Sequence, residues 1–547
     1  MDRRRQLIRG ASAQDRSRPT DSGQPDGFAR RDFLRYAAAG ATVLGVGSAL
    51  AGCGGSTASS SPSSSAAAGQ PKRGGTLTLG AQGGASNDNL DAHNPLTNAD
   101  YPRIFALYSA LVTLDSNAKV VNVLADEITS NKDATVWTVK IKSGVQTHRG
   151  KSFGAKDVLY SLRRISNAKT PFPGAAVLTP LDLQNAKVLN ATTLQLPCKT
   201  PFSTFVDSLI DPFCLMVPEG YDPKSPDGTG PFMYKSFTPG VRSEFPRHPN
   251  YFENGKPYAD DLIITDIPDE QSQVNALLGG QVNLINFLSS DSLAALQSGS
   301  VNVVISKTGG WNPITMRVDT APFSDVRVRQ AMKLIVDRPQ MLDLVFGGHG
   351  RIGNDVFGYY DPLYDHSLPQ RHQDIAQAKS LLKAAGHENL TVTLNTSAGI
   401  GQGIVKTAQV FAQQAKAAGV TVNVNAVTAS TWFGQDYLKV PFGQDYWFYL
   451  PYLVNVPQVT IPGGAFNTPH YDNPAYTKLY QQALATTDES TKADLAHQMQ
   501  KIDYNEGGLI IPYFPPVIDA TAKNVHGVVQ SPSFPISNYD WASIWVD

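Results

Sequence analysis

Aromatic side chains gather in one stretch of the sequence, and their chemistry is that of a binding surface. The stretch contains Trp432, Phe433, Tyr437, Phe442, Tyr446, Trp447, Phe448, Tyr449 and Tyr452. Aromatic rings offer large contact areas and flat faces on which apolar, peptide or sugar-like groups can stack. Residues 432–452 are therefore a candidate ligand-binding region, with packing in the protein core as the alternative for each ring.

Motifs for nucleotide, nucleophilic or metal chemistry are weak. Gly144 precedes Gly150-Lys-Ser152 by five intervening residues, whereas a phosphate-binding P-loop has four. Gly399-Ile-Gly-Gln-Gly403 could place an anion at a helix N-terminus, but its third glycine does not fall at the G-x-G-x-x-G spacing of the dinucleotide fingerprint. The chain after the leader has no Gly-x-Ser-x-Gly elbow, and its His residues are scattered. We therefore expect no enzymatic activity, no metal site and no cofactor.

Three cysteines are too few for a disulfide-stapled scaffold, and no C-x-x-C pair suggests zinc. Cys198 and Cys214 could form a disulfide in an oxidising compartment, which would contribute about 3 kcal/mol by closing a short loop. Two free thiols are the alternative.

The first 52 residues have the layout of a signal peptide. Arg30 and Arg31 precede an uncharged stretch, Ala37–Ala51, which is too short to span a bilayer as a helix. The run from Arg30 to Arg35 resembles a twin-arginine export signal, with Ala29 and Arg35 as departures from the usual pattern. A Sec signal with two incidental arginines is the alternative.

The uncharged stretch ends in Leu50-Ala-Gly-Cys53, which resembles a bacterial lipobox. In such a sequence the thiol of the cysteine receives the lipid, and two acyl chains suffice for stable anchoring. A chance cysteine after small residues is the alternative. Residues 53–71 are rich in Ser, Ala and Gly, so we expect a flexible tether there.

Composition restricts the classes of function. Hydrophobic residues make up 41% of the 547-residue chain and charged residues 17%, which is apolar enough for a sizeable core. The net charge of −1 argues against nucleic-acid binding, which needs a basic surface.

Periodicity predicts mixed α/β structure. Alternating residues predict strands over 75–80 and 135–142, and helical spacing predicts helices over 156–165, 374–385, 474–485 and 489–504. Ser324 or Asp325 can cap a further helix that begins there. A strand over 390–395, a helix over 404–418 and a strand over 420–427 predict a parallel βαβ unit.

Three blocks in the body resemble the extracytoplasmic solute-binding proteins of ABC importers, in the peptide/nickel cluster known as family 5. The blocks are residues 137–162, residues 228–257 with Gly228-Thr-Gly-Pro231, and residues 321–338 with Ser324-Asp-Val-Arg-Val-Arg329. Together with weaker matches they cover essentially all of residues 72–547. These motifs indicate scaffold roles: Asp325 caps a helix, Arg327 and Arg329 form surface or inter-strand ion pairs, and residues 228–231 form a turn.

The resemblance implies a two-lobed periplasmic-binding-protein-like α/β fold of type II with an extra subdomain in the first lobe. Lobe I would comprise residues 72–308 and 511–547, with the subdomain at about 100–225. Lobe II would comprise residues 309–510. The ligand would lie between the lobes, which close over it and then dock on a membrane permease.

The resemblance also directs attention to particular ligand contacts. Trp447 and Trp311 are the first candidates, and Trp311 follows Gly309-Gly310 at the expected lobe crossing. The further candidates are Asn312, Tyr446, Tyr452 and Arg351, although Arg351 could instead be a solvated loop residue. Peptide-binding relatives often carry an Asp shortly after the Trp to hold a ligand amine, whereas here no acidic residue follows Trp447 before Asp472. Asp445 precedes the Trp and is a doubtful substitute.

The resulting hypothesis is a monomeric, lipid-anchored, extracytoplasmic receptor that delivers a peptide or similar-sized solute to an ABC permease and ATPase. A metal chelate is a second possible class of ligand. The alternatives are an extracytoplasmic hydrolase and a sensory or chaperone binding protein without a transport role.

Overall fold

A computed structural model describes residues 70–297 and 299–547. The predicted signal peptide, Cys53 and nearly all of the predicted tether lie outside the described residues. Within the described ranges, no helix is both long enough and apolar enough to cross a membrane.

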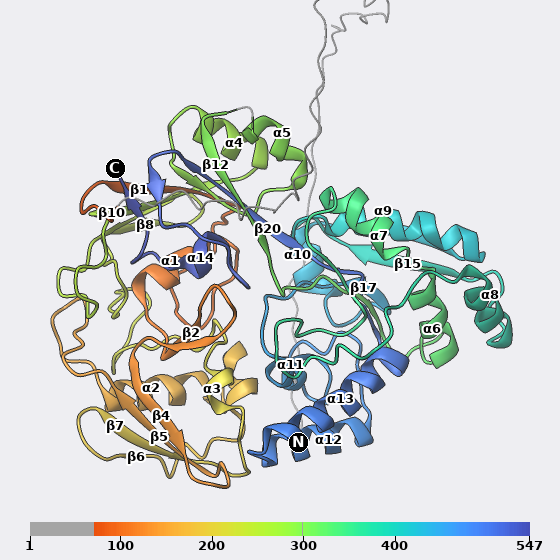
Figure 1. Ribbon diagram of the computed structural model, residues 1–547, viewed down its shortest axis with the longest axis horizontal. Coiled ribbons are helices and arrows are strands. Elements are labelled where there is room, and N and C mark those ends of the chain that lie inside the picture. The colour runs from red at the N-terminus through yellow and green to blue at the C-terminus, as the bar shows by residue number, and fades with distance from the viewer. Residues whose placement is uncertain (1–69, 298) are drawn as a thin grey trace, which may run out of the picture. The chain divides into compact units, whose positions relative to one another are not determined.

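A seven-stranded mixed sheet forms the first half of the body, in the order β12-β20-β11-β1-β10-β9-β8 (Figure 1). Its central pair, β1 (Thr76–Gln82) and β10 (Asp261–Ile267), is parallel. The predicted strand over 75–80 is thereby confirmed, because alternate residues such as Leu77 and Leu79 enter the core. The other strands are β8 (Ser236–Thr238), β9 (Arg242–Pro246), β11 (Leu284–Ile285), β12 (Val301–Lys307) and β20 (Pro516–Ala522).

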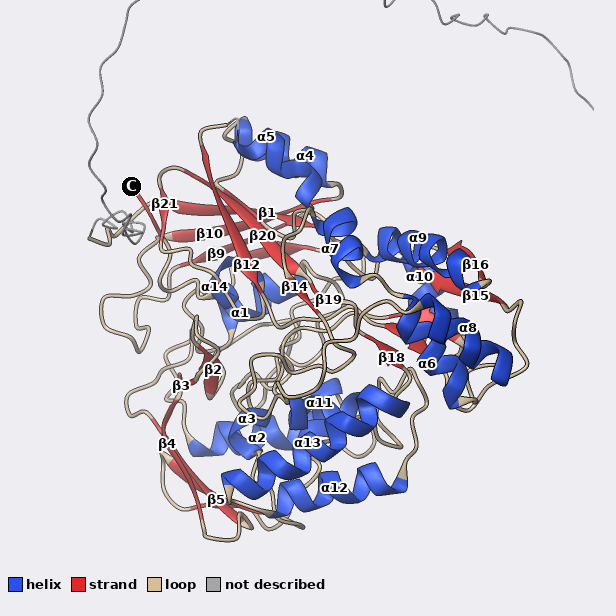
Figure 2. Ribbon diagram, turned by 45° about the vertical axis from the view of Figure 1, so that its right-hand side comes forward, coloured by secondary structure: helices blue, strands red, loops and turns tan. Residues whose placement is uncertain are grey.

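Short helices cover both faces of this sheet. Helices α4 (Glu270–Leu278) and α5 (Leu293–Gln297) lie on one face, and α1 (Asp100–Leu107) and the turn α14 (Pro535–Tyr539) lie on the other (Figures 1 and 2). Each face has its own apolar core. The motif at residues 228–231 passes against the end of α1, where a Cβ on Gly228 would lie 2.1 Å from the Leu107 carbonyl oxygen. Glycine is required there because the two backbones nearly touch.

A smaller antiparallel sheet lies within the range of the predicted extra subdomain. Its order is β4-β5-β7-β6, with bounds Ala125–Ser130, Val136–Ile141, Thr193–Pro197 and Lys187–Val188. Helix α2 (Ala155–Ile165) packs against it, so the predicted strand and helix of the first motif are confirmed. The hairpin β2 (Val112–Leu114) and β3 (Val120–Asn122) and the short helix α3 (Phe205–Ser208) complete this region.

The predicted disulfide is wrong, because Cys198 and Cys214 are both free thiols in the structure. Cys198 is held just past the end of β7, where its N–H donates to the Thr135 carbonyl at 2.8 Å. Cys214 follows a separate turn and is fully buried in the core. The open alternative of two free thiols is the one observed.

The second half of the body contains the predicted βαβ unit. Strands β15 (Thr391–Thr396) and β16 (Thr421–Ala426) pair in parallel, and α9 (Ile404–Ala415) connects them. Other predicted helices are also confirmed, as α6 (Val326–Ile335), α8 (Ile375–Ala384), α12 (Pro474–Ala485) and α13 (Glu489–Glu506). The other helices and strands of this half are α7 (Arg338–Phe346), α10 (Ala429–Thr431), α11 (Tyr452–Val459), β13 (Ile314–Met316), β14 (Arg351–Ile352), β17 (Phe442–Gln444), β18 (Leu509–Ile510) and β19 (Tyr513–Phe514). The hairpin β21 (Val525–His526) and β22 (Trp545–Val546) instead packs beside β1 in the first half.

Two neighbouring strands carry the chain between the halves. β12 leads out of the large sheet toward β13, and β20 returns from β18 and β19. The two strands pair antiparallel along their whole length, from Val301 opposite Ala522 to Lys307 opposite Pro516. Side-by-side connections of this kind suit a hinge, because both can bend at one place.

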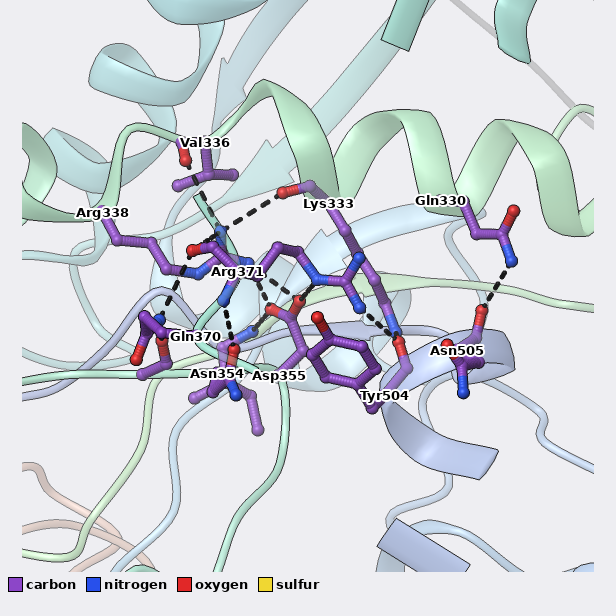
Figure 3. A network of polar contacts seen from close by, with 12 residues as sticks. Gln330, Lys333, Val336, Arg338, Asn354, Asp355, Gln370, Arg371, Tyr504 and Asn505 are labelled. Atoms are coloured by element: carbon purple, nitrogen blue, oxygen red, sulfur yellow. Dashed lines mark hydrogen bonds and ion pairs between the residues drawn. The ribbon is translucent and has the colours of Figure 1, made fainter. Parts of the chain in front are cut away.

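The third motif block works as scaffold in helix α6. Asp325 accepts a hydrogen bond from the Arg327 N–H at 2.8 Å, which confirms the predicted cap, and Arg327 is a surface partner of the same carboxylate. Arg329 corrects the prediction, because its buried guanidinium donates to the Glu506 carbonyl instead of forming an ion pair. Lys333, one turn further on, donates to the Asp503 carbonyl and to the Tyr504 carbonyl, the second of which is drawn in Figure 3. These cations bind the carboxyl end of α13, where the helix dipole is negative.

Candidate functional site

A cavity of about 930 Å³ lies between the two halves of the body. Sites for small molecules commonly enclose about 300–1,000 Å³, so the space suits a solute of that class. The first half contributes Gln82–Ala85, Asn87, Leu96–Asn98, Pro268, Glu270, Ser289 and Asp291. The second half contributes Val345, Phe346, Ala398–Lys406, Ala429, Ser430, Phe433 and Tyr446.

A narrower pocket of about 70 Å³ continues the cavity toward the strands that join the halves. The two spaces share wall residues, among them Asn98, Gln402 and Tyr446. The inner pocket adds Phe287, Thr308, Gly310, Asn312, Trp447, Phe448, Pro515–Val517 and Ser533. Aromatic faces and amide groups therefore meet at the inner end of one continuous cleft.

The glycine-rich segment 399–403 brings bare backbone to the cavity wall. Gly403 caps α9 with φ +73°, a conformation that favours glycine, and a Cβ there would lie 2.7 Å from side-chain atoms of Val345 and Phe346. The first turn of α9, Ile404 to Lys406, also lines the cavity. Free N–H groups at such a helix start can donate to a ligand oxygen.

Gln402 connects the two walls directly. Its Nε2 donates to Oε1 of Gln82 at 3.0 Å and to the Phe287 carbonyl at 2.9 Å. Near the opening, Lys406 Nζ lies 3.7 Å from Asp291 Oδ1 across the same gap. The halves are therefore in contact through polar side chains, which is the arrangement expected of a closed cleft.

Asp445 is buried behind the aromatic wall and already has partners. Its Oδ2 accepts from the Tyr437 hydroxyl at 2.9 Å, and its Oδ1 accepts from the Tyr446 N–H at 2.9 Å. Burial raises the pKa of this carboxyl to about 7, against the opposing hydrogen bonds. Asp445 lines neither space, so it does not replace the missing amine anchor.

Three of the six predicted contact residues line the cleft: Trp447, Tyr446 and Asn312. Trp311 does not line it, because its ring is fully buried in a stack between Phe357 and Trp447, with centroids 4.9 and 5.5 Å away. Its backbone exchanges two hydrogen bonds of 2.9 Å with Trp447, so it supports the ring that does reach the pocket.

Tyr452 and Arg351 also lie away from the cleft walls. The Tyr452 hydroxyl donates to buried Asp503 at 2.6 Å. The Arg351 guanidinium donates to the Tyr360 hydroxyl at 3.1 Å and packs over the Tyr359 ring, so these contacts are with tyrosines outside the cleft walls. Tyr452 and Arg351 were predicted as contacts because their side chains can bind ligands, but neither side chain faces the cleft.

Sequence reasoning missed the amides of the cleft. Gln82, Asn98 and Gln402 come from segments far apart in the chain and carry no motif of their own. The sequence did indicate one part of the cleft: the glycines at 399–403 predicted a weak anion motif at the start of α9.

Comparisons with known proteins agree with this architecture. The sequence model of the bacterial extracellular solute-binding proteins, family 5 Middle, matches residues 119–453. The glutathione-binding protein GsiB of Pectobacterium atrosepticum is 25% identical over 481 residues, covering 82% of this chain and 91% of the relative.

Solved structures give the same fold. The periplasmic binding protein DppA from Helicobacter pylori, in complex with the peptide STSA, has a TM-score of 0.77 at 18% identity, covering 87% of this chain and 98% of that one. The binding protein AgaA of A. tumefaciens R10, in complex with agropinic acid, has a TM-score of 0.76 at 20% identity, covering 86% and 99%. Both likenesses establish the fold alone.

Proposed function

Because the chain belongs to the family 5 bacterial extracellular solute-binding proteins, we propose that it is a lipid-anchored receptor that delivers a peptide or similar-sized solute to an ABC permease. Members of this family bind solutes for ABC importers and are not enzymes. The observation that carries the proposal is the cavity of about 930 Å³ whose walls come from both halves of the body. Closing two walls over a solute removes it from water, and the solute stabilises the closed form to the extent that it binds that form better.

The proposed lobe boundaries follow the connecting strands. Lobe I comprises residues 72–308 and 511–547, including a subdomain at about 100–225, and lobe II comprises residues 309–510. The antiparallel pair β12 and β20 supports this division, since the first boundary follows Lys307 and the second precedes Pro516.

The proposed ligand contacts are Trp447, Tyr446 and Asn312 at the inner end of the cleft. The Trp447 ring offers a face for stacking, and the Asn312 amide can donate and accept hydrogen bonds. Trp311, Arg351 and Tyr452 act as supports behind the wall.

The proposed ligand class follows from the names of similar proteins, but the cleft wall around Trp447 has no counter-charge for a free amine. The names of the similar proteins mention glutathione and a peptide, which favours a peptide-sized solute here. A peptide held by its free α-amine would need a buried counter-charge. The wall around Trp447 does not provide one, since Asp445 is turned to Tyr437.

The lipid anchor at Cys53 and the twin-arginine leader are part of the same proposal. Cys53→Ser removes the thiol that would receive the lipid, so the protein should move from the membrane fraction to the soluble extracytoplasmic fraction. The matched control is Cys198→Ser, which removes a thiol elsewhere and should leave the protein in the membrane fraction. Equal membrane association of Cys53→Ser and wild type would contradict the anchor.

The direct test of the receptor role is identification of the native ligand. The full chain carrying Cys53→Ser is purified from the extracytoplasmic fraction, and native mass spectrometry identifies any solute that co-purifies. Adding that solute back to stripped protein should raise the Tm with concentration, as mass action requires. Chemical conversion of the solute by the protein would contradict a receptor.

A further inference from the structure

The polar groups that face the cleft are mostly amides, hydroxyls and backbone. Of the described residues that line the larger cavity, three have acidic or basic side chains: Glu270, Asp291 and Lys406. The other polar side chains include Gln82, Asn87, Asn98 and Gln402. Amides both donate and accept, so they suit neutral polar partners.

The three charged side chains already have partners or lie at the opening. Glu270 Oε1 accepts from the N–H and hydroxyl of Ser289 at 2.9 and 2.8 Å, and from the Ser292 hydroxyl. Asp291 and Lys406 pair at the rim, where their side chains are 79% and 44% exposed. Water screens such a pair, so it offers little fixed charge to a bound ligand.

The inner pocket contains no Asp, Glu, Lys, Arg or His among its lining residues, all of which are described. Two acidic residues behind the walls already contact other side chains. Asp445 is held by Tyr437, and Asp266, which lies behind Gly84, pairs with buried Arg103. A ligand ammonium or carboxylate that entered this pocket would lose its water without gaining a counter-ion, which is costly.

One partial charge remains at the cleft, at the amino end of α9. Its first turn lines the cavity, and N–H groups there favour a ligand oxygen. A carbonyl or hydroxyl oxygen can accept hydrogen bonds from these N–H groups as a carboxylate does, and it avoids the cost of burying a full charge.

We propose that the cleft selects uncharged polar solutes, rich in amide or hydroxyl groups and free of an unblocked amine or carboxylate in the inner pocket. The inference rests on the proposed receptor function and narrows its ligand class. Amides recognise the polar groups, while Tyr446, Trp447 and Phe448 provide faces for the apolar surface. The inference also separates this chain from glutathione binders, because glutathione carries an amine and two carboxylates.

The test compares one peptide with charged and with blocked termini, and adds charged and neutral compounds of similar size. One tripeptide with a central Phe is prepared in four forms: free, N-acetylated, C-amidated and doubly blocked. Glutathione and neutral trisaccharides complete the panel. Tm shifts and calorimetry are measured on stripped full chain carrying Cys53→Ser. We expect at least one neutral compound to bind, with an affinity at least tenfold higher than that of charged compounds of the same size. Its affinity should change little between 50 and 500 mM salt.

Three results would overturn the inference. The first is tighter binding of the free peptide or glutathione than of every neutral compound. The second is a preference for the N-acetylated free acid, which would instead make the start of α9 an anion site. The third is that no neutral compound binds. The receptor role itself would survive the first two, because a charged solute would still be bound; it fails if no compound and no co-purified solute binds.

A variant of the wall gives an independent readout. Asn98→Asp adds a carboxylate to the surface shared by both spaces at nearly constant shape. Affinity for the neutral ligand should fall at least tenfold, while amine-bearing analogues should gain. The control, Asn167→Asp, makes the same change on an exposed turn and should leave affinity unchanged. Unchanged affinity in Asn98→Asp would count against the inference.

Discussion

At the scale of single residues, stacked tryptophans have different roles. Trp311 and Trp447 lie with ring centroids 5.5 Å apart, yet only Trp447 lines the cleft. Composition alone identifies both as binding candidates, because a tryptophan in the core and one in a wall have the same chemistry. The face that each ring presents depends on the bridge between their backbones, which joins residues more than a hundred positions apart.

Substitution separates the two roles. Trp447→Ala should weaken ligand binding about tenfold or more, because a stacking face is lost, with a moderate loss of stability. Trp311→Ala should lower the free energy of unfolding by about 3–5 kcal/mol, because it leaves a cavity beneath the wall. Ligand titration and urea unfolding of both variants check this. Equal loss of affinity with no loss of stability in Trp311→Ala would place its ring in the site.

The buried carboxyl of Asp445 predicts a pH dependence of stability. Its folded pKa is raised to about 7, above the unfolded value, so the folded chain keeps this proton to higher pH. The contribution to stability is therefore full below about pH 4 and is lost as pH rises to about 7. Asp445→Asn cannot ionise, so its stability relative to wild type should grow across this window, by on the order of 1 kcal/mol per pH unit.

Urea unfolding of both proteins at several pH values from 4.5 to 8 measures this difference. Tyr437 and Tyr446 still contact the amide in the variant, so the comparison isolates the ionisation. A difference that stays constant with pH would show that burial does not control the protonation of Asp445.

At the scale of elements, helical periodicity located several helices of the second half, although it did not locate α1, α4, α7 or α11. The predicted helices that became α8, α9, α12 and α13 begin within two residues of their observed starts, because caps such as Asp374 and Asp488 mark them. The role of Arg329 was not predictable in the same way. Its partner is a carbonyl at the end of α13, almost 180 residues later, and carbonyls leave no sign in a sequence.

The contact between α6 and α13 predicts a stability effect at Lys333. Its buried ammonium donates to the Asp503 and Tyr504 carbonyls at 2.8 and 3.1 Å. Lys333→Met keeps the length of the side chain but removes the donor, so stability should fall by about 2–3 kcal/mol. Gln330→Ala removes a single bond to Asn505 at the edge of the same contact, and should cost under about 1 kcal/mol. Equal losses in urea unfolding would contradict a special role for Lys333.

The start of α9 predicts a change in the balance between open and closed forms. Gln402 bonds both Gln82 and the Phe287 carbonyl, so Gln402→Ala removes two hydrogen bonds that exist only when the walls meet. The ligand-free variant should populate the open form more than wild type does, by about fivefold to a hundredfold. Single-molecule distances between labels on the two lobes measure this population. The control, Gln413→Ala, removes an exposed side chain on α9, the helix that begins two residues after Gln402.

At the scale of the whole molecule, local pattern and long-range pairing differ in what they reveal. The alternation in residues 75–80 predicts β1, but nothing in it predicts β10 as a neighbour some 185 positions away. The pairing of β12 with β20 likewise joins segments more than 200 residues apart. Resemblance to a family predicted the two-lobed organisation, but it did not predict which side chains line the cleft.

The closed arrangement has contacts beyond the cleft. One apolar core includes residues of the small sheet, such as Leu194, and residues of the second half, such as Tyr476. The Gln458 amide donates to buried Asp211 across the same contact at 3.1 Å. Opening therefore exposes surface on both sides of the cleft, so ligand binding must compete with contacts that favour closure without a ligand.

The central claim is that two lobes close over a solute that is carried unchanged. Small-angle X-ray scattering of the stripped chain, with and without the solute identified from native protein, tests it most directly. The account predicts a smaller radius of gyration with solute, and a larger ligand-free radius in Gln402→Ala than in wild type. A radius that is the same in all three samples, while the solute is shown to bind, would contradict closure.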